Sequence, residues 1–189
     1  MDQPKAATKI TGQEHWTTKG EVRLFLWEKR AAGGKAPRGT VLFVHGSSMG
    51  SQPTFDLQVP GRPHSSAMDY FAGLGFDTWC VDMEGYGRSD KKRDINCDIA
   101  NGADDLAAAT AYIIKTRGTR SFLTYGISSG ALRAARRAVR AAPSRAGQAP
   151  RARCLCLDGR GQPDARRPAQ EAARVPGEEP PADRPRLRA

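Results

Sequence analysis

The chain has 189 residues, of which 39% are hydrophobic, and it carries a formal net charge of +10. This length predicts a single domain, and the hydrophobic fraction, although low, is compatible with a globular protein. No run of about 18 apolar residues occurs, which argues against a membrane span. The N-terminal segment MDQPKAATKI lacks the apolar core of a secretory signal, so we expect a cytoplasmic protein.

The cysteines give no sign of a metal centre or a disulfide framework. The chain has four of them, and they form no C-x-x-C pair and no metal-ligand spacing. Cys80 lies in an apolar, strand-like run, which predicts a buried free thiol. We therefore expect neither a metal nor a cofactor.

The basic charge belongs to the last third of the chain. Residues 131–189 contain 14 Arg, no Lys and 6 acidic residues, and 41 of these 59 residues are Ala, Arg, Pro or Gly. After Ile127 the sequence has no Ile, Phe, Tyr or Trp. Such a segment has little large apolar surface to offset the loss of chain entropy on folding. We expect it to be disordered or irregular.

The first 130 residues alternate between strand-like and helix-like segments. Strand-like runs occur at 21–29, 41–44, 78–81 and 121–125, and apolar residues follow helical spacing over 67–74 and 106–114. Ser66 and Asp69 form a variant of the capping box, and Gly75 and Gly118 are placed to end the two helices. The alternation predicts an α/β fold, with a mostly parallel sheet flanked by helices.

The strongest chemical signal is the G-x-S-x-G pattern of Gly126, Ser128 and Gly130, which follows a strand and begins an Ala-rich helix. A sharp strand-to-helix turn brings backbones close together, and glycines two positions before and after the serine remove the Cβ atoms that would clash. The serine hydroxyl then stands at a helix N-terminus, where developing negative charge is favoured. The pattern predicts that Ser128 is a catalytic nucleophile.

Two further patterns follow the preceding strands. His45-Gly46 comes directly after the 41–44 run, where a loop backbone can supply an oxyanion donor, which we assign to the N–H of Ser47. The N–H of Ser129, next to the nucleophile, would be the second donor. We expect His45 to be structural. The segment that begins at Asp82 and contains Gly85, Gly87 and Ser89 is interpreted as a scaffold loop.

Together these motifs resemble the α/β-hydrolase superfamily over about residues 20–136. The resemblance implies a mostly parallel sheet flanked by helices and acyl-enzyme chemistry, in which a serine attacks a carbonyl, a histidine relays the proton and an acid orients the histidine. It implies a small-molecule substrate with a carboxylic ester or related acyl bond. The long polar loop over 47–65, which contains His64, is expected to overhang the site. Residues 1–136 would be the N-terminal part of the hydrolase domain, and 137–189 a separate tail.

The chain departs from this family after Ser128. The family order is serine, then acid, then histidine, yet the three histidines all precede Ser128. The later acids Asp158 and Asp164 follow no convincing strand. Loss of a triad member costs several orders of magnitude in rate. We therefore expect the chain as written to be inactive.

The composition of the tail suggests a frameshift near residues 131–138. Ala, Arg, Pro and Gly are the residues encoded when the first two codon bases are G or C. Residues 138–144 can be encoded so that a reading one base later gives Leu-Phe-Ala-Gln-Arg-His-Pro, which continues a helix and ends it before proline. Residues 154–158 give Ala-Phe-Val-Trp-Thr in the same way, which is a strand-like run.

Two other interpretations are open. The chain could be a non-enzymatic, truncated product, because half a sheet leaves an unpaired edge and an uncovered face. It could also bind nucleic acid through its Arg-rich tail. The tail has no aromatic residue for base stacking and no basic helix with a clear face. We therefore expect no nucleic-acid partner.

Overall fold

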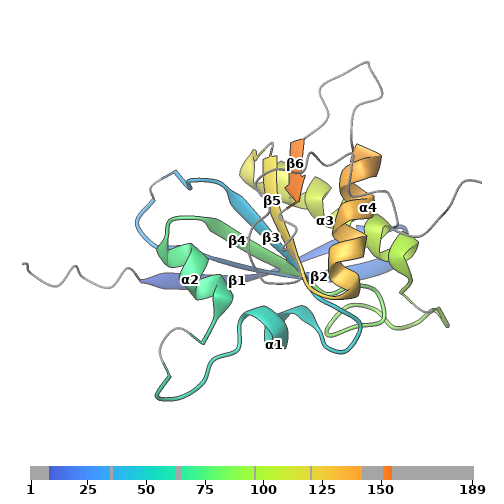
Figure 1. Cartoon of the computed structure of the whole chain (residues 1–189), viewed down its shortest axis with the longest axis horizontal. Helices are drawn as coiled ribbons and strands as arrows, with labels where there is room; N and C mark the ends of the chain where they lie inside the picture. Colours follow the sequence, from blue (N-terminus) through green and yellow to red (C-terminus); the bar gives the residue numbers. More distant parts are fainter. Residues whose placement is uncertain are drawn as a thin grey trace, which may run out of the picture. The chain divides into compact units, whose positions relative to one another are not determined.

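The computed structural model describes residues 9–34, 36–62, 65–95, 97–119, 121–141 and 151–154. These residues fall within the first of two compact units, Met1–Cys156. Six strands form one sheet in the order β1-β2-β4-β3-β5-β6, which can be followed in Figure 1. The strands are β1 Ile10–Lys19, β2 Val22–Ala31, β3 Thr40–Val44, β4 Asp77–Val81, β5 Ser121–Gly126 and β6 Arg151–Cys154.

The sheet is parallel at its centre and antiparallel at one side. β3 pairs in parallel with β4 and with β5, and β5 pairs in parallel with β6. β2 runs antiparallel to both β1 and β4. All five residues of β3 and all five of β4 are buried, as expected of strands covered on both faces. The predicted α/β fold with a mostly parallel sheet is therefore confirmed.

Four helices cover the two faces of the sheet (Figure 1). They are α1 Ser51–Phe55, α2 Ala67–Gly73, α3 Ile99–Arg117 and α4 Ser129–Ala141. Alternate residues of β3 point to opposite faces: Leu42 belongs to the core cluster of α3 and α4, and Phe43 to the core cluster of α1 and α2. Within the described residues, no helix combines the length and hydropathy needed to cross a bilayer.

The predicted helix boundaries are confirmed where local chemistry sets them. The Ser66 hydroxyl accepts the backbone N–H of Asp69 at 3.0 Å and caps α2. Gly75 and Gly118 follow α2 and α3 with φ of +89° and +67°, in the left-handed region that favours glycine. The predicted burial of Cys80 as a free thiol is also confirmed.

Three regions differ from the sequence prediction. β1 precedes the first strand that we expected, and most of its residues are exposed, so it lacks the apolar alternation of a half-buried strand. The 47–65 segment, predicted as a continuous loop, contains the short helix α1. The segment expected to be irregular from residue 137 contains the end of α4 and the strand β6. The boundary after residue 136 stays a prediction, because residues 142–150 and 155–189 lie outside the described residues.

Glu28 on β2 and Asp77 at the start of β4 form a buried carboxyl pair, which makes the free energy of unfolding depend on pH. Burial, aided by the neighbouring Glu28, raises the pKa of Asp77 from 3.8 to about 7. A carboxyl group whose pKa is raised on folding contributes stability below its ordinary pKa, and that contribution is lost as the pH rises through about 7. Asp77→Asn should therefore match the parent chain near pH 4 and become progressively more stable than it between pH 5 and pH 8.

Urea unfolding of both proteins across this pH range measures the difference. Asp104→Asn is the control, because Asp104 is exposed and pairs with Arg140 at the surface. The free energy of unfolding of the control should differ from that of the parent by a small amount that is nearly the same at every pH. A stability difference for Asp77→Asn that does not change with pH would contradict the prediction.

Candidate active site

Ser128 lies at a strained turn between β5 and α4. Its φ is +52°, and among the described residues it is the one non-glycine residue with a positive φ. The N–H of Gly130 donates to the carbonyl oxygen of Ile127 at 2.9 Å, and the N–H of Ala131 donates to that of Ser128 at 3.0 Å. These bonds close the turn directly into the helix. The Ser128 side chain is left exposed to solvent.

Each of the three predicted motif glycines is required by a close backbone or side-chain approach. A Cβ on Gly126 would lie 2.7 Å from the backbone of Ala131, and one on Gly130 would lie 2.3 Å from the carbonyl oxygen of Val44. A Cβ on Gly46 would lie 3.0 Å from the Cβ of Ser128. Gly46 therefore faces Ser128 across the ends of two neighbouring strands.

The loop after β3 and the turn after β5 are held side by side. The N–H of Ile127 donates to the carbonyl oxygen of Val44 at 3.2 Å, and the hydroxyls of Ser47 and Ser129 share a hydrogen bond of 2.7 Å. In the part of the chain that the structure describes, no acceptor is recorded for the backbone N–H of either serine. That these two N–H groups stabilise an oxyanion stays a prediction.

His45 has both ring nitrogens occupied. Its Nε2 accepts the backbone N–H of Met83 at 3.0 Å, so the proton resides on Nδ1, which donates to the carbonyl oxygen of Gly46 at 2.6 Å. The ring is fully buried, and burial lowers the pKa of His45. A neutral, fully hydrogen-bonded imidazole orients the loop and has no nitrogen left for proton transfer. The prediction that His45 is structural is confirmed.

Asp82 has a structural role as well. One carboxylate oxygen accepts the N–H of Ser51 at 2.6 Å and its hydroxyl at 2.7 Å, and the other accepts the N–H of Arg88 at 2.8 Å. A Cβ on Gly87 would lie only 2.0 Å from this carboxylate. Asp82 therefore joins the start of α1 to the loop after β4, which confirms that this loop is scaffold.

No base for Ser128 is found in the described residues. His15 is buried on β1, where its ring nitrogens lie 2.9 Å from a Glu28 oxygen and 3.1 Å from the Tyr112 hydroxyl. His64, Asp158 and Asp164 lie outside the described residues. Among the described residues, the structure thus brings Ser128 together with Gly46, Ser47 and Ser129, and it places no histidine with a free ring nitrogen beside them.

Two buried polar groups near the site were missed by the sequence analysis. Arg133 on α4 is 1% exposed, and its Nη2 donates to the carbonyl oxygen of Cys97 at 2.6 Å. Glu84 follows β4, and hydrogen bonds from Arg93 and Lys19 hold its pKa at about 2 against the effect of burial. Gly102 lies within α3 and packs against Arg133, but it precedes the 106–114 segment that the sequence predicts as helical, so no signal in the sequence indicated this contact.

Comparison with known families agrees with this geometry. Residues 35–152, more than half of the chain, match the family of hydrolases described as serine aminopeptidase, S33. The chain belongs to this α/β-hydrolase family. The matched range contains the Gly46 loop, the turn at Ser128 and the strands that position them. No curated protein matches the chain.

Solved structures with the same fold include three hydrolases. A predicted CIB-like hydrolase from Thermoplasma acidophilum has 16% identity and a TM-score of 0.53, and the match covers 70% of this chain and 58% of that one. Est1E from Butyrivibrio proteoclasticus, solved with ferulic acid bound, has 18% identity, a TM-score of 0.52 and coverage of 67% and 47%. Potato epoxide hydrolase I has 20% identity, a TM-score of 0.52 and coverage of 69% and 36%. The chain therefore spans between about a third and three fifths of the length of these hydrolases.

Proposed function

We propose that the chain derives from a serine hydrolase that acts on a carboxylic ester or related acyl bond, with Ser128 as its nucleophile. The observation that carries the proposal is the positive φ of Ser128 at a glycine-flanked turn that faces Gly46. Strain of this kind persists when the surrounding structure enforces it, and it is concentrated at functional sites. A serine at this position favours acyl transfer, because family members that open epoxides generally use an aspartate there.

The reaction would proceed through an acyl-enzyme. The Ser128 Oγ attacks the carbonyl carbon while a base removes its proton, and the carbonyl oxygen takes the negative charge. The N–H groups of Ser47 and Ser129 would donate to this oxyanion. Collapse of the tetrahedral intermediate releases the alcohol, which takes the proton back from the base. Water then attacks the acyl-serine in the same way and releases the acid.

We further propose that the chain as written does not complete this cycle. In the described residues both histidines are committed elsewhere, since His45 binds Gly46 and Met83 and His15 binds Glu28 and Tyr112. Without a base the serine hydroxyl is a weak nucleophile, and the oxyanion donors alone supply a residual rate several orders of magnitude lower. A frameshift after Ser128 would account for the missing acid and base. The free thiols of Cys80 and Cys97 agree with a cytoplasmic location, which we also propose.

A fluorophosphonate probe tests the proposal, because it reacts only with an activated serine. The comparison is a restored version, in which the codons after Ser128 are translated in the frame that begins one base later. We expect Ser128 in the present chain to be labelled at least about 1,000-fold more slowly than in this restored version. Ser128→Ala in the restored version is the control and should abolish labelling. Failure of the restored version to label, or labelling that survives Ser128→Ala, would overturn the assignment of the nucleophile. Rapid labelling of the chain as written would overturn the proposed inactivity.

A further inference from the structure

Helix α4 packs against α3 and the sheet, and two arginines on it occupy contrasting environments. Arg133 and Arg137 are four residues apart, so they lie one above the other on the same face of the helix. This face points toward the core, where an arginine is tolerated only if its polar groups find partners. The partners that each arginine finds therefore show whether its helical turn is compatible with the surrounding core.

The surrounding structure is complementary to Arg133. Its guanidinium donates to the carbonyl oxygen of Cys97 at 2.6 Å and to that of His45 at 3.4 Å, and it lies 5.9 Å from the centre of the Tyr86 ring. On α3, a Cβ at Gly102 would lie 2.4 Å from the Arg133 Cδ. A glycine in the first turn of α3 thus makes room for this arginine, although the two positions are far apart in sequence.

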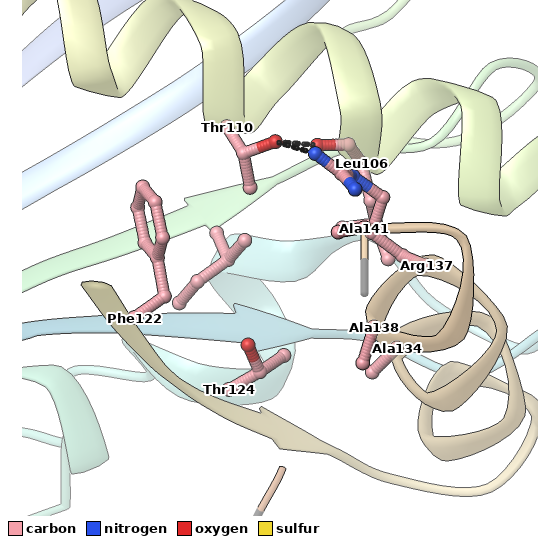
Figure 2. A pocket seen from close by; sticks show the side chains of 9 residues that line it. Leu106, Thr110, Phe122, Thr124, Ala134, Arg137, Ala138 and Ala141 are labelled. Atoms are coloured by element: carbon pink, nitrogen blue, oxygen red, sulfur yellow. Dashed lines mark hydrogen bonds between the residues drawn. The ribbon is translucent and has the colours of Figure 1, made fainter. Parts of the chain in front are cut away.

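Arg137 has no comparable site. Its Nη2 donates to the Thr110 hydroxyl at 3.2 Å, the one hydrogen bond that its guanidinium makes among the described residues, and its buried Nε, like that of Arg133, has no partner there. Burial lowers the pKa of the Arg137 guanidinium. Figure 2 shows the side chain beside Leu106 and Thr110 at the edge of a pocket between α4, α3 and the sheet. Leu42 and Phe122 complete the apolar lining of this pocket.

The apolar side chains of α4 that face the pocket are small, and both large aliphatic residues of the helix, Leu132 and Val139, are exposed. The residues of α4 that line the pocket, besides Arg137, are Ala134, Ala138 and Ala141, as Figure 2 shows. The large apolar residue of this part of the helix, Val139, is 63% exposed. Small side chains thus face the core and the large one faces away, which is the reverse of an amphipathic helix. A well-packed core does not leave such a gap.

We infer that the residues compatible with this fold end within the helical turn between Arg133 and Arg137. The pocket beneath α4 is then the site of a large aliphatic side chain at position 138. Residues 138–144 can be encoded so that the reading one base later has a leucine at position 138, directly at the pocket. The family match extends past this boundary, to residue 152. The inference rests on the proposed frameshift and is independent of the role of Ser128.

Thermal unfolding of point variants tests this inference in the chain as it exists. Arg137→Leu and Ala138→Leu should each raise Tm by about 3 °C, because each adds apolar contact in the pocket. Arg133→Leu should lower Tm by about 5 °C or abolish cooperative unfolding, because it leaves two carbonyl groups unpaired. Arg136→Leu, at an exposed position of the same helix, is the matched control and should leave Tm unchanged.

A Ser128→Ala background in every variant keeps this readout separate from the proposed chemistry. Destabilisation by Arg137→Leu comparable to that by Arg133→Leu would overturn the inference, since α4 would then suit the fold beyond the proposed boundary. The coding sequence from codon 125 gives a second readout that does not depend on folding. We expect the neighbouring frame to be open and to encode a large aliphatic residue at position 138, and an early stop codon in that frame would equally overturn the inference.

Discussion

Gly130→Ala should prevent the chain from folding cooperatively. The added Cβ would lie 2.3 Å from the carbonyl oxygen of Val44 and 2.5 Å from that of His45. Both obstacles are backbone atoms at the end of the central strand β3, so no side-chain rotation can relieve the overlap. Either β5 and α4 move away from β3, or the turn at Ser128 is lost. The expected cost is on the order of 4 kcal/mol or more, which is a large fraction of the stability of a typical domain.

Urea unfolding followed by circular dichroism measures this effect. Gly73→Ala is the matched control: Gly73 lies at the end of α2, and a Cβ there would meet no atom within 4 Å. The control should be neutral or more stable by about 0.5 kcal/mol, because alanine favours the helix. Equal stability of Gly130→Ala and Gly73→Ala would mean that the close approach at Ser128 does not exist.

Lys19→Met should cost about 3 kcal/mol at neutral pH, because it leaves two buried carboxylates without their cation. The Lys19 ammonium contacts Glu84 at 2.9 Å and also binds Asp105, and the two carboxylates are 2% and 0% exposed. Although burial opposes the charge, hydrogen bonds to Asp105 and Glu84 raise the pKa of Lys19. Arg93 would still neutralise part of the charge on Glu84, so Asp105 carries most of the penalty.

The pH dependence of this loss follows from the carboxylates. In the parent chain the pKa of Glu84 falls from 4.5 to about 2, so its contribution is present above about pH 4.5 and is lost as the pH falls through about 2. Burial raises the pKa of Asp105, and removal of Lys19 would raise it further, so protonation of Asp105 relieves its share of the penalty first as the pH falls. The difference between Lys19→Met and the parent should therefore be largest above neutral pH and should shrink as the pH falls. Lys115→Met, near the end of α3, is the control. A stability loss for Lys19→Met no larger than that of the control would contradict the prediction.

Local chemistry explains which parts of the fold could be predicted from the sequence. The buried strands β3 and β4, the Ser66 cap and the glycine ends of α2 and α3 depend on neighbouring residues, so short-range patterns predict them. The same holds for the turn at Ser128, where two glycines and a serine lie within five residues. The roles of His45 and Asp82 followed from their positions after strands.

The missed features depend on contacts between distant parts of the chain. β1 is mostly polar and is held by its hydrogen bonds to β2. Arg133 is buried because Gly102 on another helix leaves space for it, and Lys19 is partly buried because Glu84 and Asp105 meet it from two other elements. A single sequence gives the residue types of such partners, but not their pairing.

The parallel pairing of β3 with β5 sets the relative position of the two loops at the proposed site. Its last rung pairs Val44 with Gly126, and the oxyanion loop and the nucleophile turn both begin within two residues of it. A slip of one residue between these strands would carry both loops apart and reverse the faces of every side chain on β5. The arrangement that we propose for attack on a carbonyl therefore depends on the register between β3 and β5, near the middle of the sheet. That alignment involves no histidine and no acidic residue, so the proposed nucleophile and the Gly46 loop would stay in register where an acid and a base are lacking.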